Sequence, residues 1–280
     1  MNIELCPNPQ KDRDYEYTRC AARRLLAHGA TLWCAHDIPN LDSVHVGTCD
    51  RPDFRLVLGG DGSMMRAAKR GAEQNVPLLG INLGRVGYLA EMNTDELYLL
   101  DNVLLGHFTV EHRMMLDVSI TRQGKVHMSG RCALNDAVVS HGRVSRLLET
   151  EVLCDGNSLG RYRSDGFIVT TPTGSTAYSL SAGGPILDPS LRGIGLTPIS
   201  PHSLTARPII VPEEAAITLC YRSPLDETAY LTVDGEETAE LLPGDTVELC
   251  RSSLTTKLIR PQRDCKKSFY DILREKMSDI

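Results

Sequence analysis

The sequence predicts a parallel α/β domain followed by an all-β domain. Strand and helix signals alternate over roughly the first hundred residues, which is the pattern of a parallel sheet covered by helices. After about residue 112, helix-length patterns give way to short β segments separated by turn dipeptides. With 280 residues and 41% apolar side chains, the chain can bury a core in each part. We therefore expect an α/β domain over residues 1–112, a β-rich domain over 113–258 and a helical tail over 259–280.

The elements of the first domain follow from hydrophobic periodicity and from capping signals. Small and apolar residues recur at helical spacing between Asp14 and Gly29, and Gly29 closes that helix as a C-cap would. A second helix has Met64, Ala67, Ala68, Gly71 and Ala72 on one narrow face. The remaining elements are strands at 3–6, 31–35, 54–58 and 77–82 and a helix at 94–105 with Thr94 as its cap.

In the second domain, β-branched and apolar runs alternate with turn residues. Asp155-Gly156 and Asp234-Gly235 lie between such runs and predict hairpin turns. The predicted strands are 115–121, 131–140, 147–153, 166–171, 216–221, 230–233 and 246–250. The last twenty residues turn helical again, because Phe269, Ile272, Leu273 and Met277 share one face.

Composition excludes two classes of partner and indicates a compartment. The net charge is −6, and no run of Lys or Arg resembles a nucleic-acid footprint. No stretch approaches the ~18 apolar residues of a membrane span, and the N-terminus lacks a basic segment followed by an apolar run. The nine cysteines, from Cys6 to Cys265, form no C-x-x-C pair or metal-ligand spacing, which favours reduced thiols and a soluble, cytoplasmic protein.

Residues 56–63, Leu-Val-Leu-Gly-Gly-Asp-Gly-Ser, carry the strongest functional signal. The glycines remove the Cβ atoms that would hold a ligand away, and the helix start behind them offers free N–H groups to a phosphate. Asp61, however, places a negative charge there, and like charges about 4 Å apart repel by roughly 1 kcal/mol even in water. Either a divalent cation neutralises the site, or Asp61 accepts a proton from a hydroxyl that attacks a phosphoryl group.

The alternative for this loop is an ordinary tight turn, since Gly and Asp dominate turns. The loop is not a Walker sequence, because no Gly-Lys-Ser/Thr follows, and it is not the G-x-G-x-x-G dinucleotide fingerprint. Phosphate would therefore be held by the backbone and a metal.

Residues 165–185 form the second signal, a run rich in Ser, Thr, Gly and Pro. A polar loop is the simpler interpretation, because these residues favour loops. The run is nevertheless long for an idle connection, since loops beyond ~12 to 15 residues are usually functional. It also places Tyr178 among hydroxyls and small side chains, which suits stacking on a flat ring.

Asn135-Asp136 is the third signal, because it interrupts an apolar strand. Adjacent strand residues point to opposite faces, so at least one of the two polar side chains faces the core or a cleft unless a bulge or a strand end intervenes. Arg163 and Asp165 flank the next turn and could form a solvated ion pair worth about 0 to 1 kcal/mol. His202 lacks an evident acid or nucleophile partner and is interpreted as structural.

Taken together, five motifs resemble the NAD kinases over roughly residues 54–277. They are Gly59-Gly60-Asp61-Gly62-Ser63, the segment Gly80–Ala90, Leu134-Asn135-Asp136, the segment Thr173–Ser181 and Pro198-Ile-Ser-Pro-His-Ser-Leu. The first motif alone is shared with lipid kinases and phosphofructokinases, whereas the Thr176–Ser181 block and the Pro-His-Ser segment are more specific.

The resemblance implies a Rossmann-like α/β domain, a sandwich-type β domain that binds NAD, and a C-terminal tail that packs back on the first domain. It implies transfer of the γ-phosphoryl of ATP to the 2′-hydroxyl of the adenosine ribose of NAD, with a divalent metal, usually Mg²⁺, whose ligands stay unassigned. It also implies homodimers or homotetramers in which a neighbouring subunit completes the pocket. Asp61 would be the proton acceptor, and the nucleotide contacts would be Gly60, Gly62, Asn135, Asp136, Arg146, Arg163, Asp165, Thr176, Ala177, Tyr178, Ser179, Leu180 and Ser181.

Two departures from the family pattern and two rival functions stand beside this resemblance. Glu236 follows the Asp-Gly turn where family members often carry Gln, and Ser63 replaces a common Thr but keeps the hydroxyl. A lipid kinase could share the glycine loop, although it would be expected to offer an apolar groove. A non-catalytic NAD(H)-binding regulator could share the whole fold, although Asp61 is retained.

Overall fold

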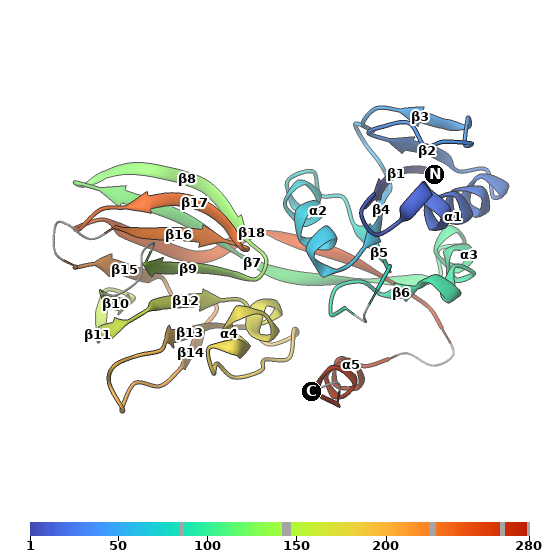
Figure 1. Ribbon diagram of the computed structural model, residues 1–280. Coiled ribbons are helices and arrows are strands. Elements are labelled where there is room, and N and C mark those ends of the chain that lie inside the picture. The colour runs from blue at the N-terminus through green and yellow to red at the C-terminus, as the bar shows by residue number, and fades with distance from the viewer. Residues whose placement is uncertain (85–86, 142–146, 224–227, 264–266, 279–280) are drawn as a thin grey trace. The chain divides into compact units, whose positions relative to one another are not determined.

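The computed structural model describes residues 1–84, 87–141, 147–223, 228–263 and 267–278. The chain divides into two compact units, one comprising Met1–His112 with Thr256–Ile280 and the other Arg113–Thr255. It passes from one unit to the other within two long strands, β7 (Phe108–Arg122) and β18 (Thr246–Pro261) (Figure 1). Each unit has a hydrophobic core of its own.

The first unit is built on a parallel sheet. Its strands lie in the order β5-β4-β1-β2-β3, with β6 beside β5, and every one of these pairs is parallel. The end of β18 joins the same sheet next to β5, where Leu258 faces Leu78. The strands are β1 (Asn2–Pro7), β2 (Thr31–Cys34), β3 (Val44–Val46), β4 (Phe54–Gly59), β5 (Leu78–Asn82) and β6 (Met92–Asn93).

Short helices complete this α/β unit (Figure 1, blue to cyan, with α5 in red). They are α1 (Glu16–Ala27), α2 (Asp61–Glu73), α3 (Leu99–Leu104) and α5 (Phe269–Ser278), with 3-10 turns η1 (Arg13–Tyr15) and η2 (Thr94–Glu96). Helix α1 buries Thr18, Ala21, Ala22 and Leu25, which share one helical face. Gly29 follows it with a φ of 77°, so the predicted glycine stop is confirmed.

The predicted helix over 94–105 starts at the predicted residue but is wrong in its cap and in its continuity. Helical structure begins at Thr94 with η2, Asn93 is the cap, with its N–H donating to Glu96 at 2.8 Å in a capping box, and the segment breaks between η2 and α3. Thr94 is therefore not the cap.

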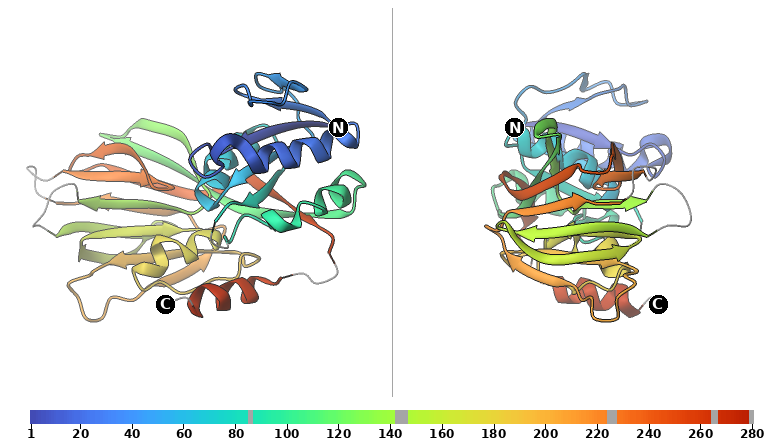
Figure 2. Two further views of the ribbon diagram at one scale, coloured as in Figure 1. Left: turned by 45° about the vertical axis from the view of Figure 1, so that its right-hand side comes forward. Right: turned by 90° about the vertical axis from the view of Figure 1, so that its left-hand side faces the viewer.

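The second unit is a β sandwich. One sheet has the order β14-β13-β12-β9-β16-β17, and the facing strands follow the order β11-β10-β15-β18-β7-β8. The strands of the two sheets lie in two layers (Figure 2). Leu116, Val139, Phe167 and Leu219 come from both sheets and share one buried core. The elements not yet given are β8 (Lys125–Ala133), β9 (Asp136–His141), β10 (Leu148–Cys154), β11 (Asn157–Ser164), β12 (Gly166–Thr170), η3 (Thr173–Thr176), α4 (Tyr178–Ser181), β13 (Gly193–Ile199), β14 (Ile209–Pro212), β15 (Ile217–Tyr221), β16 (Ala229–Val233) and β17 (Glu236–Leu241). The predicted fold class, an α/β domain and a β-sandwich domain, is confirmed.

Both predicted hairpins are present, and one predicted strand is not. Asp155-Gly156 joins β10 to β11 and Asp234-Gly235 joins β16 to β17, each with two positive φ angles. The predicted strand 131–140 is instead two strands, β8 and β9, which are separated at Leu134-Asn135. Among the described residues, no helix is long and apolar enough to span a membrane.

Candidate active site

Strand β4 carries the glycine loop to the carboxyl edge of the parallel sheet. All six residues of β4 are buried, and the strand lies between β1 and β5. Gly60 follows in an extended conformation, and Asp61 is the first residue of α2. Ligands of open α/β sheets bind outside the carboxyl ends of the strands. The loop singled out in the sequence therefore lies where a nucleotide would bind.

The Asp61 carboxylate is half-buried and turned toward the segment that follows β5. It accepts the N–H of Tyr88 at 2.9 Å and the N–H of Leu89 at 3.0 Å, one on each oxygen. A Cβ on Gly87 would lie 2.2 Å from Asp61 Oδ1, so this close approach requires glycine. Because each carboxylate oxygen has a further lone pair, the group is held in one orientation and can still accept a proton.

Lys11, in the loop after β1, lies beside the glycine loop and is a candidate that was not among the predicted site residues. Its Nζ lies 2.8 Å from the position that a Cβ on Gly60 would take, so the ammonium group sits over the bare backbone of the glycine loop. Strands β1 and β4 are parallel neighbours, and the loops that follow them therefore meet at one edge. That adjacency was the signal available in the sequence, since Lys11 follows the first predicted strand.

A cationic cavity of about 230 Å³ adjoins the first turns of α2. Ser63 Oγ accepts hydrogen bonds from Asn8 Nδ2 at 2.9 Å and from Arg66 at 3.1 Å beside it. The lining residues are Cys6, Pro7, Asn8, Arg55, Ser63, Arg66, Ala67 and Arg70. The glycine loop thus has basic side chains on the side of α2 as well as on the side of Lys11.

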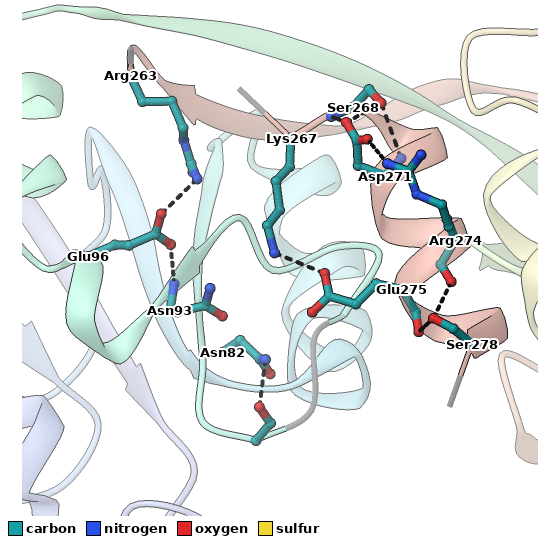
Figure 3. Close-up of polar contacts among 11 residues, drawn as sticks. Asn82, Asn93, Glu96, Arg263, Lys267, Ser268, Asp271, Arg274, Glu275 and Ser278 are labelled. Carbon is teal, nitrogen blue, oxygen red and sulfur yellow. Dashed lines mark hydrogen bonds and ion pairs between the residues drawn. The ribbon is translucent and has the colours of Figure 1, made fainter. Parts of the chain in front are cut away.

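The tail holds the segment 91–96 in place through Arg263. Its guanidinium donates to Glu96 at 2.9 Å (Figure 3). It also donates to the carboxylate and carbonyl oxygens of Glu91, at 3.0 and 2.8 Å. Arg260 binds Glu91 as well and reaches Glu111 at 2.7 Å. Arg260 and Arg263 therefore join the tail to the segment 91–96, which follows Tyr88 and Leu89 in the chain.

Helix α5 covers the side chain of Tyr88. The Tyr88 ring lies 6.0 Å from the Phe269 ring, and Lys276 Nζ lies 4.4 Å from the Tyr88 centroid. Burial, and then the charge of Asp61, raise the pKa of the Tyr88 hydroxyl. Beside Lys267 and Glu275, which pair at 2.9 Å (Figure 3), is a cavity of about 470 Å³. It is lined by Tyr17, Asn82, Leu83, Gly84, Asn93, Thr94, Asp95, Lys267 and Glu275.

In the β unit, Asn135 precedes strand β9 and Asp136 is its first residue. The strand end that was an alternative in the sequence is therefore what the structure has. Asp136 is only 5% exposed, and burial together with the neighbouring Asp234 raises the pKa of its carboxyl to about 7. Gly174 packs against this dipeptide, because a Cβ on Gly174 would lie 2.1 Å from the Asn135 carbonyl oxygen. The second and third sequence signals thus meet in one place.

The predicted contact block Thr176–Ser181 is a short helical segment with uneven exposure. Tyr178, Leu180 and Ser181 are exposed, whereas Thr176 and Ala177 are half-buried. Ser179 is buried, and its hydroxyl lies 3.1 Å from the Thr197 hydroxyl. The block is therefore not an irregular loop, and the Ser179 side chain is buried and hydrogen-bonded inside the β unit.

Arg163 lies near the end of β11, and Asp165 is the single residue between β11 and β12. Arg163 is exposed, and its carbonyl oxygen accepts the N–H of the exposed His202 at 2.8 Å. Asp165 Oδ1 lies 3.6 Å from His141 Nε2. Arg146, the remaining predicted contact, lies outside the described residues. Among the residues that are described, no group of three or more His, Cys, Asp or Glu side chains could hold a metal ion.

A parallel α/β unit with a glycine loop at its carboxyl edge, joined to a β sandwich, defines a nucleotide-dependent phosphotransferase of two domains. Residues 40–107 match the ATP-NAD kinase N-terminal domain, and residues 134–261 match the ATP-NAD kinase C-terminal domain. The chain belongs to the ATP-NAD kinase family, as its motifs predicted.

Relatives of similar length support this membership. The chain is 37% identical to an NAD kinase from Natranaerobius thermophilus, over 99% of this chain and 98% of that protein. It is 44% identical to an NAD kinase from Geobacter sulfurreducens, over 80% of this chain and 78% of the relative.

Two solved structures resemble this one. The yeast NADH kinase complexed with NADH has a TM-score of 0.85 and 26% identity, over 98% of this chain and 85% of that one. An NAD kinase from Archaeoglobus fulgidus in complex with ATP has a TM-score of 0.73 and 24% identity over the full length of both chains, and supports the fold.

Proposed function

We propose that this phosphotransferase moves the γ-phosphoryl of ATP to the 2′-hydroxyl of the adenosine ribose of NAD and so forms NADP. The observation that carries the proposal is the Asp61 carboxylate, which two backbone N–H groups orient inside a glycine loop of the ATP-NAD kinase family. A ribose hydroxyl is a weak nucleophile, and a carboxylate within about 3 Å could take its proton as the loose transition state forms.

In this mechanism the α/β unit positions the donor. Lys11 and the N–H groups at the start of α2 bind the phosphates of ATP, because they offer positive charge and donors beside backbone without side chains. Gly60 and Gly62 allow the phosphates to approach. Alignment and charge neutralisation then supply most of the rate acceleration.

A divalent cation, Mg²⁺ by the family resemblance, fits this donor set. Mg²⁺ in kinase sites is held by one or two carboxylates, substrate phosphates and water, and a dedicated cage of acidic side chains is not needed. Asp61 is the candidate contact from this chain, through water. When bound, the ion would neutralise charge on the transferred phosphoryl group.

The β unit would bind NAD. The contacts that we propose are Asn135, Asp136, Arg146, Arg163, Asp165, Thr176, Ala177, Tyr178, Ser179, Leu180 and Ser181. Tyr178 is 47% exposed and offers its ring for stacking, which supports this assignment. Because the Ser179 hydroxyl is bonded to Thr197, Ser179 would contact NAD through its main chain.

We also propose a homodimer or homotetramer in the cytoplasm. Leu204 is 91% exposed and Ile210 is 50% exposed, next to a cavity of about 300 Å³ that Arg163 helps to line. A second copy seated there would cover the apolar side chains and contact Arg163. Light scattering of the purified protein tests the oligomer, and a monomer at assay concentration would contradict it. The cysteines within the described segments are free thiols, which supports the compartment.

The test of the function is NADP formation by the purified protein. ATP, Mg²⁺ and NAD are supplied together, and a coupled NADP-specific dehydrogenase reports the product. We expect product that depends on all three components. If no product forms with ATP or polyphosphate and with any of several divalent metals, while NAD still binds, the chain is a non-catalytic regulator. Family membership removes the support for the lipid kinase alternative.

A further inference from the structure

One carboxylate in the β16–β17 turn binds the main chain of all three residues of the Leu134-Asn135-Asp136 motif. Asp234 accepts the N–H of Leu134 at 2.8 Å, of Asn135 at 2.7 Å and of Asp136 at 3.2 Å. The Asp234 N–H in turn donates to the Asp136 carbonyl at 2.9 Å. Burial raises the pKa of the Asp234 carboxyl, and the three backbone N–H groups act in the opposite direction by favouring its ionised form.

The carbonyl groups of the same motif accept hydrogen bonds from Thr170, the last residue of β12, and from Thr171, which follows it. Thr171 donates from its N–H to the Asn135 carbonyl at 2.8 Å and from its hydroxyl to the Leu134 carbonyl at 2.6 Å. The Thr170 hydroxyl also reaches the Asn135 carbonyl, at 3.0 Å. Since both the donors and the acceptors of this backbone are satisfied, the direction in which the Asn135 and Asp136 side chains leave the main chain is fixed.

The Asp136 carboxyl, by contrast, receives none of these three N–H groups, because they donate to Asp234. It is 95% buried, and no described residue donates a hydrogen bond to its side-chain oxygens. Burial, followed by repulsion from Asp234, raises its pKa to about 7. Glu236 raises the pKa of Asp234 in turn. The adjoining strand β12 ends in the neutral Thr170, followed by the neutral Thr171, and Arg113 of β7 donates to Thr173. Below about pH 7 such a carboxyl keeps its proton and can donate a hydrogen bond.

We propose that Asp234 is a positioning residue of the NAD site, which fixes the Asn135-Asp136 dipeptide through its main chain and makes the Asp136 carboxyl a hydrogen-bond donor to the bound dinucleotide. The inference rests on the proposed function, because Asp136 is assigned to NAD there. It adds a residue outside the predicted contacts and a protonation state for one inside them. Protonated Asp136 would offer its O–H to an acceptor such as a ribose or carboxamide oxygen of the ligand.

The test measures NAD affinity without ATP, by calorimetry from about pH 6 to about pH 8.5. In the wild type we expect the affinity to fall as the pH rises through about 7, by up to about tenfold per pH unit once Asp136 ionises. Asp234→Asn should weaken NAD binding by at least about tenfold near pH 6, because the amide is a poorer acceptor for three N–H groups. It should also move the fall in affinity about one unit to lower pH, because the repulsion that keeps the proton on Asp136 is gone.

Asp155→Asn is the matched control. Asp155 occupies the same position in the other Asp-Gly hairpin, with a φ of 50°, and it accepts the N–H of Ala216 at 2.9 Å. We expect this variant to keep the wild-type affinity and the wild-type pH profile.

Asp136→Asn provides a second reading if Asp234→Asn fails to fold. Its amide donates at every pH, so NAD binding should stay within about threefold of the wild type at low pH and lose its dependence on pH near 7.

The outcomes separate this inference from the proposed function. If wild-type protein binds NAD with the same affinity across the range, or if Asp136→Asn retains the wild-type profile, the donor role is overturned while the proposed function stands. If Asp234→Asn binds like Asp155→Asn, the positioning role is overturned. If the wild type does not bind NAD at any pH, the proposed function fails and this inference fails with it.

Discussion

Two carboxylates, Asp61 in the α/β unit and Asp136 in the β unit, receive opposite surroundings. Asp61 is half-buried, and two backbone N–H groups meet its negative charge. Asp136 is buried beside Asp234, and the three nearby backbone N–H groups donate to Asp234 rather than to Asp136. The comparison teaches that burial, together with a neighbouring charge and the supply of main-chain donors, decides which carboxylate is suited to hold a proton and which is suited to accept one.

The largest expected effect concerns stability. The pKa of Asp136 rises from 3.8 to about 7 on folding, so the unfolded chain releases its proton at a lower pH than the folded protein does. Stability from this group is complete below about pH 4 and is lost as the pH rises to about 7, by up to roughly 4 kcal/mol. Urea unfolding of the wild type and of Asp136→Asn at about pH 5 and about pH 7.5 measures this difference. A difference that does not change with pH would show that Asp136 is not buried as described.

Gly87→Ala should disturb Asp61 without touching its chemistry. The new Cβ would overlap Asp61 Oδ1, and the segment 87–89 must shift away from the carboxylate. Because a misplacement of about 1 Å can cost about a hundredfold, we expect turnover to fall by at least that factor while NAD affinity is kept. Steady-state kinetics measure the effect, and full turnover in this variant would mean that the two N–H bonds do not orient the base.

Tyr178→Ala should weaken NAD binding with little loss of stability. The ring is 47% exposed, and stacking of a base on an aromatic ring contributes about 1–3 kcal/mol. Calorimetry with NAD and a thermal melt measure the two quantities, with Tyr98→Ala, at a side chain that is 55% exposed, as the control. A collapsed melting temperature with unchanged affinity in the folded fraction would indicate a core role instead.

Lys11→Ala should raise the KM for ATP by about tenfold and leave NAD affinity unchanged, because one exposed charge on a phosphate is partly screened. The effect should shrink at high salt. The control is Lys125→Ala, at an exposed lysine of strand β8. Equal KM values for ATP in the two variants would remove Lys11 from the donor site.

Local chemistry made several parts of the fold predictable. Asp155-Gly156 and Asp234-Gly235 were predicted as hairpins because the turn needs two residues that tolerate positive φ. The strand before Gly59 and the helix after it were predicted from a buried apolar run and from a face of small residues.

The rest depends on contacts between distant residues. The break between β8 and β9 falls inside an apolar run, and the carboxylate that stabilises it, Asp234, lies about a hundred residues further along the chain. Lys11 reaches Gly60 only because β1 and β4 are neighbours in the sheet. Ser179 has the same local sequence surroundings as the other hydroxyl residues of its block, and only its contact with the Thr197 hydroxyl distinguishes it. Such pairings have no local sequence signature.

The most direct test of the account makes the same substitution at both carboxylates. Asp61→Asn and Asp136→Asn are compared at about pH 6.5 for NAD affinity and for the rate of NADP formation with saturating ATP and Mg²⁺. We predict that Asp61→Asn binds NAD but loses turnover by roughly 10²- to 10⁴-fold, whereas Asp136→Asn stays within about tenfold of the wild-type rate. Wild-type turnover in Asp61→Asn, or an equal loss in both variants, would contradict the assignment of Asp61 as the proton acceptor.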